Sequence, residues 1–75
     1  MLNKLDICAE IGNTFGDFYV DVSGILTIET YNEIYTYKTE DELLRDWLPK
    51  LEEADSVLQD DYWIDIINYI REEIL

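Results

Sequence analysis

The hydrophobic residues of this chain change their spacing along the sequence, and the spacing predicts the order of its elements. Residues 2–12 fit two patterns: apolar side chains at alternate positions, as in a β-strand, and an apolar stripe at helical intervals. Gly12 could end such a helix, and the polar residues Asn13 and Thr14 follow it directly. We therefore favour a short N-terminal helix and keep the strand as the alternative.

Residues 17–38 are rich in β-branched and aromatic side chains, which is typical of strands. Turn residues at 22–24 and 31–33 divide this stretch into three segments, so we expect a three-stranded antiparallel meander. The length of the second turn decides which face of the sheet Tyr35 and Tyr37 occupy, and the sequence leaves that open.

The register of the first two strands follows from their apolar residues. A two-residue turn would split these side chains between the two faces of the sheet. A three-residue loop that ends in a left-handed Gly24 gathers them on one face instead, so we expect this loop. The pairs it predicts are Val20 with Leu26 and Phe18 with Ile28.

A helix start follows the last strand. Thr39 can cap the helix N-terminus while the Glu42 carboxylate reaches back to the Thr39 amide. The expected buried stripe of this helix is Leu44, Trp47, Leu48 and Leu51. Because Pro49 interrupts this stripe, we expect either one kinked helix over residues 40–54 or two short pieces broken at Leu48.

The last apolar stripe predicts a C-terminal helix after a link at residues 54–56. It begins either at Ser56, with Gln59 completing a second capping box, or at Asp60. The expected buried face is Trp63, Ile66, Ile67, Ile70 and Ile74. Together the segments predict an α+β fold: a single small domain of residues 1–75, with a short N-terminal helix, a three-stranded antiparallel meander and two C-terminal helices packed on one sheet face, in the order α-β-β-β-α-α.

The composition limits how this domain is held together and where it works. The lone Cys8 cannot form an internal disulfide, and no histidine is present to complete a zinc site, so packing must stabilise the fold. One free cysteine fits a reducing compartment. No leader segment and no apolar run of about 18 residues is seen, so we expect a soluble, cytoplasmic protein that does not bind membranes.

The charge is strongly negative and unevenly placed. The chain has 18 Asp and Glu against 5 Lys and Arg, a formal net charge of −13. Residues 39–75 contribute −9 of this, from twelve acidic and three basic side chains. Phosphates would be repelled by such a surface, so we expect no direct nucleic-acid binding and instead a basic protein surface as partner. The oligomeric state is left open.

The sequence offers little that could perform catalysis. A Ser or Cys nucleophile would lack its usual histidine base, and Cys8 lies in an apolar segment where a buried side chain is the simpler reading. The glycines at 12 and 16 are not followed by the Lys-Ser/Thr pair of a phosphate-binding loop, and no calcium-loop pattern surrounds "QDDYWID" at residues 59–65. We therefore expect no enzyme, no cofactor and no metal site.

Two acidic rows stand out on the C-terminal helices. Their members have the same spacing, +4 then +7, and lie opposite the apolar stripes; they are Glu42, Asp46 and Glu53 on the first helix and Asp61, Asp65 and Glu72 on the second. Tyr62 and Tyr69 border the second row, and partly exposed tyrosines often contribute to interfaces. These eight residues are the candidate partner-binding surface. The alternative is that the rows are solvated helix faces of a protein that is acidic for solubility or for life at high salt.

The order of elements and the charge resemble those of small phage-encoded anti-CRISPR proteins that act as acidic DNA mimics. The resemblance covers the whole chain and implies an inhibitor whose carboxylates occupy the site where a CRISPR nuclease binds DNA; no single residue is transferred by it. We therefore expect an acidic inhibitor that mimics nucleic acid and blocks a basic nucleic-acid-binding enzyme, such as a CRISPR or restriction nuclease. The alternative is a non-mimetic interaction module: an immunity protein, an antitoxin or a small oligomerising subunit.

Overall fold

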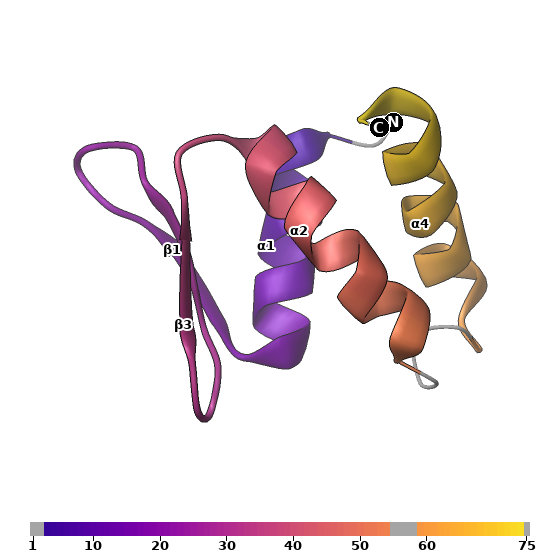
Figure 1. Cartoon of the computed structure of the whole chain (residues 1–75), viewed down its shortest axis with the longest axis horizontal. Helices are drawn as coiled ribbons and strands as arrows, with labels where there is room; N and C mark the ends of the chain where they lie inside the picture. The colour runs from indigo at the N-terminus through magenta and orange to yellow at the C-terminus, as the bar shows by residue number, and fades with distance from the viewer. Residues whose placement is uncertain (1–2, 55–58, 75) are drawn as a thin grey trace. The chain divides into compact units, whose positions relative to one another are not determined.

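The computed structural model describes residues 3–54 and 59–74, and Figure 1 shows their elements. The elements are α1 (Lys4–Phe15), β1 (Asp17–Val20), β2 (Leu26–Glu29), β3 (Ile34–Tyr37), α2 (Glu40–Glu53) and α4 (Asp61–Glu73). This confirms the predicted α+β class and the order α-β-β-β-α-α. By their contacts the residues form two compact units, Met1–Leu43 and Leu44–Leu75, and each is described by itself. The single domain and the packing of the C-terminal helices on the sheet stay predictions.

The N-terminal segment is a helix, as favoured, but Gly12 does not end it. Asn3 caps α1, since its side-chain oxygen accepts hydrogen bonds from the backbone N–H groups of Leu5 at 2.9 Å and Asp6 at 3.3 Å. The helix continues through a buried Gly12 and ends at Phe15, with Gly16 as its C-cap. Residue 2, where the predicted stripe began, lies outside the described residues.

Gly12 serves the packing of α1 on the sheet. A Cβ atom at Gly12 would lie 2.4 Å from the Cβ of Phe18 on β1, so only glycine lets the helix approach the strand this closely. α1 packs against β1 and β2, as Figure 1 shows. Ile7 and Ile11 of α1 and Ile28 of β2 are buried almost completely in this unit.

The sheet has the predicted register. Its strand order is β1-β2-β3, with Val20 opposite Leu26 and Phe18 opposite Ile28. Gly24 has φ 86° in the β1–β2 loop, which confirms the left-handed glycine. The loop is closed by a hydrogen bond of 3.1 Å from the Asp21 N–H to the Ile25 carbonyl oxygen.

The second turn places Tyr35 and Tyr37 on the apolar face of the sheet. They lie opposite Ile28 and Leu26 respectively, and both are half-buried. The six residues of the other face, here called the open face, are Asp17, Tyr19, Thr27, Glu29, Ile34 and Thr36. All of them except Thr27 are exposed, whereas the apolar face carries the buried Leu26 and Ile28 of β2.

Helix α2 begins with the predicted cap. The Thr39 hydroxyl oxygen accepts from the Glu42 N–H at 3.2 Å. The Glu42 carboxylate, however, accepts from the Lys38 N–H at 3.0 Å rather than from Thr39, so it ties the helix to the residue that follows β3. The helix runs through Pro49 without a break, and its predicted stripe, Leu44, Trp47, Leu48 and Leu51, is buried.

Helix α4 starts at the second of the two predicted positions. Asp60 caps it, with its carboxylate accepting from the Tyr62 N–H at 2.9 Å. The Ser56 start and most of the 54–56 link lie outside the described residues. The predicted buried face, Trp63, Ile66, Ile67, Ile70 and Ile74, is buried throughout. Within the described ranges, none of the helices combines the length and apolar character needed to cross a membrane.

Cys8 is buried in α1, as its apolar surroundings predict. Burial, and after it the negative charges of Glu40 and Asp41, raises the pKa of the Cys8 thiol from 9.0 to about 12. The Sγ atom lies 3.9 Å from the backbone oxygen of Glu40. A protonated, inaccessible thiol is a poor nucleophile and a poor metal ligand.

Because of Cys8, the free energy of unfolding should decrease as the pH rises in the alkaline range. Above pH 9.0 the unfolded chain loses the thiol proton, while the folded chain keeps it up to about pH 12. Stability should fall by about 1.4 kcal/mol per pH unit in this window. Urea unfolding of the protein and of Cys8→Ala across this range measures the effect. Because tyrosines also ionise in this range, the variant should show a slope that is shallower by this amount, and equal slopes would contradict the assignment.

Candidate protein-interaction surface

The acidic row on α2 is exposed, but parts of it already have partners within the protein. Glu42, Asp46 and Glu53 are all exposed. The Glu42 carboxylate holds the Lys38 amide, as described above. Asp46 forms an ion pair of 3.4 Å with Lys50, one helical turn further on, and this cation also lies 5.5 Å from the centre of the Trp47 ring. The third member, Glu53, forms no ion pair or side-chain hydrogen bond with another described residue.

The acidic row on α4 is less occupied. Asp61, Asp65 and Glu72 are exposed along a helix whose opposite face is buried. Among residues 3–54 and 59–74, no ion pair or side-chain hydrogen bond involves these three carboxylates. With a rise of about 1.5 Å per residue, the row extends for roughly 16 Å. It is the stronger candidate for contact with a basic partner.

The two tyrosines beside this row differ in exposure. Tyr62 is 47% exposed and its ring meets the Trp63 ring edge-on, with centroids 6.0 Å apart. Tyr69 is half-buried. Trp63 is itself buried, so it gives the exposed Tyr62 ring a packed neighbour on one side. An aromatic ring next to carboxylates can contact the aliphatic stem or the charged group of a lysine or arginine.

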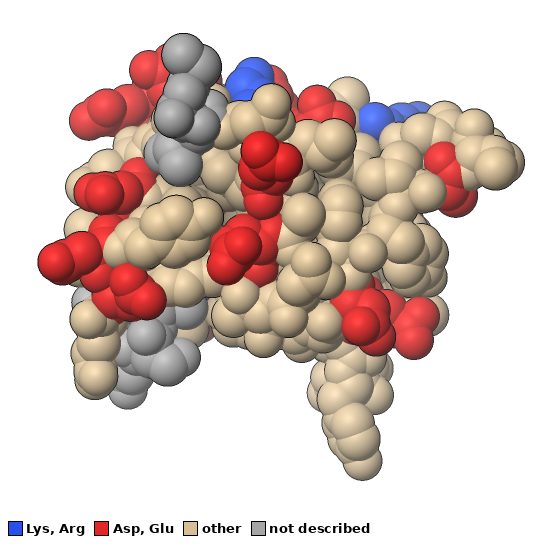
Figure 2. All heavy atoms as spheres, turned by 180° about the vertical axis from the view of Figure 1, so that it is seen from behind, with Lys and Arg blue, Asp and Glu red and all other residues tan. Residues whose placement is uncertain are grey.

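In the part of the chain that the structure describes, the ion-paired cations bind carboxylates outside the α4 row. Lys4 pairs with Asp41 at 2.9 Å, Lys50 with Asp46 at 3.4 Å, and Arg71 with Glu52 of α2. Arg71 precedes Glu72 but points to Glu52, which is not a member of either row. Figure 2 shows one face of the molecule, on which acidic groups are widely spread and basic groups few.

The carboxylates do not gather into a metal-binding cluster in the described part of the chain, where no three potential ligands come together. They are spread along helices instead, which suits contact with several cations of a partner surface rather than coordination of one ion. The arrangement can therefore attract and orient a basic protein, with fast association and strong dependence on salt.

One exposed surface was missed by the sequence reasoning. The open face of the sheet carries Tyr19 at 46% and Ile34 at 64% exposure, and neither side chain had been assigned to a face of the sheet from the sequence. The alternation of apolar and polar residues in β3 was visible, but its phase depended on the second turn.

Comparison of the chain with known protein families, curated proteins and solved structures finds no match.

Proposed function

We propose that this protein is an acidic inhibitor that mimics nucleic acid and blocks the basic binding surface of a nucleic-acid-binding enzyme, such as a CRISPR or restriction nuclease. The observation that supports this most is the α4 row. Its three exposed carboxylates lie on one helix, and none of them pairs with a cation among the described residues. A surface that grips phosphates through Lys and Arg also attracts such a row.

The row is costly for the protein on its own. Asp61 and Asp65 are one helical turn apart, and like charges at this spacing destabilise a helix by about 0.2–0.5 kcal/mol. Lysine at position 65 would turn this repulsion into attraction. That the chain keeps the repulsion, with a net charge of −13, fits a row selected for contact with a cationic partner.

Inhibition of DNA cleavage tests the proposal directly. The protein should inhibit at least one member of a panel of purified CRISPR and restriction nucleases, and raising the concentration of the duplex DNA substrate should relieve the inhibition by competing for the same site. Inhibition should also weaken steeply as salt rises, because it depends on exposed charges. Polyglutamate at matched charge is the control for bulk acidity.

Two results would contradict the proposal. One is the absence of inhibition across the panel. The other is a tight complex that neither duplex DNA nor salt disturbs, which would instead indicate a non-mimetic interaction module.

A further inference from the structure

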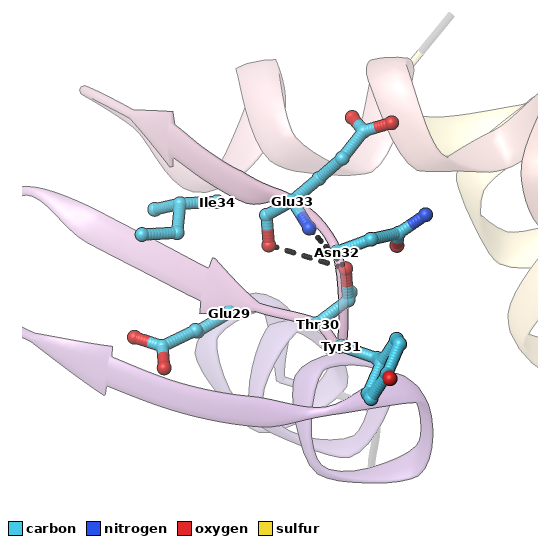
Figure 3. Close-up of a pocket in the computed structure, with 6 residues that line it drawn as sticks. All are labelled: Glu29, Thr30, Tyr31, Asn32, Glu33 and Ile34. Atoms are coloured by element: carbon cyan, nitrogen blue, oxygen red, sulfur yellow. Dashed lines mark hydrogen bonds between the residues drawn. The ribbon is translucent and has the colours of Figure 1, made fainter.

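The open face of the sheet presents apolar and acidic groups together. Asp17, Glu29 and Ile34 form one row across the three strands, and Tyr19, Thr27 and Thr36 form the next. Figure 3 shows Glu29 and Ile34 side by side at the end of this face. Thr27, at the centre of the face, is only 5% exposed, because the neighbouring side chains shield it; its cross-strand neighbours are Tyr19 and Thr36.

The exposed apolar residues of this face need an explanation. An isoleucine that is 64% exposed contributes little to the core, and Tyr19, on the other outer strand of the same face, is 46% exposed. The Tyr19 hydroxyl donates to the Glu29 carboxylate at 3.4 Å, which orients both groups on the surface. An aromatic ring, an aliphatic side chain and an oriented carboxylate are the parts of a small interface.

The charge around this face identifies what can cover it. Between residues 5 and 37 the sequence has no Lys, Arg or His, and the strands and turns carry Asp17, Asp21, Glu29 and Glu33. A second copy of the chain would bring carboxylates against carboxylates here. A basic segment would instead meet complementary charge over the whole sheet.

A hollow at the β2–β3 turn adds a place for a long side chain. Its volume is about 470 Å³, and its lining residues, seen in Figure 3, are Glu29, Thr30, Tyr31, Asn32, Glu33 and Ile34. The turn is held by the Thr30 hydroxyl, which donates to the Glu33 carbonyl oxygen at 3.1 Å and accepts from the Glu33 N–H at 3.2 Å. The fully exposed Tyr31 ring suits a guanidinium, which stacks on aromatic rings and binds carboxylates in a planar fork.

We propose that the open face and this hollow bind an arginine-bearing, partly apolar segment of a basic partner protein. The arginine contacts the Glu29 carboxylate, and apolar side chains of the segment cover Ile34 and Tyr19 on the two outer strands. Because an exposed ion pair alone contributes little, the apolar contact supplies much of the affinity. None of its residues belongs to the α4 row, so this inference does not depend on the proposed function.

A peptide of alternating arginine and leucine residues tests the inference by NMR titration of the full-length protein. The amides of Thr27, Glu29 and Thr36 should shift together and saturate. Ile34→Ser, which keeps the charge, should weaken binding about tenfold, equivalent to ~1.4 kcal/mol. Glu29→Gln should weaken it more than the matched control Glu10→Gln, which removes one charge from α1.

Three outcomes would overturn it. Shifts confined to α4 would do so while leaving the proposed function intact. Shifts spread over all acidic residues, with Ile34→Ser as tight as the parent, would indicate diffuse attraction only. A concentration-dependent dimer of the free protein that Ile34→Ser dissociates would show that the face is covered by a second copy.

Discussion

Replacing Gly16 by alanine should remove a large fraction of the stability of this protein. A Cβ atom at Gly16 would lie 2.0 Å from the Glu29 carbonyl oxygen and 2.8 Å from the Glu29 carbonyl carbon. Both are backbone atoms of β2, so no side chain can rotate away, and either the end of α1 or the strand must move. The Gly16 φ of 178° is extended backbone open to any residue, so the cost is steric.

We expect a loss of about 3 kcal/mol or more from this clash. A chain of 75 residues has a total stability of roughly 4–11 kcal/mol, so the loss is a large fraction of it. The melting temperature should fall by about 12–24 °C, and thermal unfolding followed by circular dichroism measures the change.

Gly24→Ala is the matched control for this substitution. Gly24 has φ 86°, a conformation that costs other residues about 1–2 kcal/mol, but an added Cβ would meet no atom within 4 Å. This variant should therefore lose less than Gly16→Ala. If Gly16→Ala melts with the parent protein, the close approach of the α1 end to β2 is wrong.

The sheet register could be predicted because its information is local. Phe18, Val20, Leu26 and Ile28 lie within eleven residues, and only a three-residue loop with a left-handed glycine puts them on one face. The buried faces of α2 and α4 followed from helical periodicity in the same way. In each case one pattern and one turn or cap determined the result.

The roles of Gly12 and Gly16 could not be predicted, because they depend on contacts between separate elements. Gly12 was read as a helix end, since glycine after an apolar stripe is a common stop signal. In the structure it lies inside α1, and Phe18 occupies the space that a side chain at this position would need. The sequence contains no local sign that a strand will pass so near.

The candidate site was predictable to a similar degree. Periodicity predicted that both acidic rows would be exposed, and all six members are. The Asp46–Lys50 ion pair could also have been found, because the two residues are four apart on a helix. The pairing of Arg71 with Glu52, nineteen residues away, could not, and this pairing leaves Glu72 without the nearest cation.

Reversing two charges on α4 should abolish inhibition of a nuclease that the protein inhibits. Asp65→Lys with Glu72→Lys replaces two exposed carboxylates in the middle and at the end of the row. Close charge pairs across an interface contribute about 1.5–7 kcal/mol each, so even the low end predicts a loss of more than about 100-fold. Asp61 is left unchanged, because lysine in the first turn would oppose the helix dipole.

The control has the same net charge but keeps the row. Glu10→Lys with Glu33→Lys changes two exposed carboxylates that belong to neither row and should reduce inhibition only slightly, through the change in total charge. The half-inhibitory concentration of both variants in the DNA cleavage assay, with circular dichroism to verify folding, gives the comparison. Because both variants share one net charge, equal losses would mean that total charge rather than the α4 row drives binding. Two variants as active as the parent would place the contact surface elsewhere on the protein.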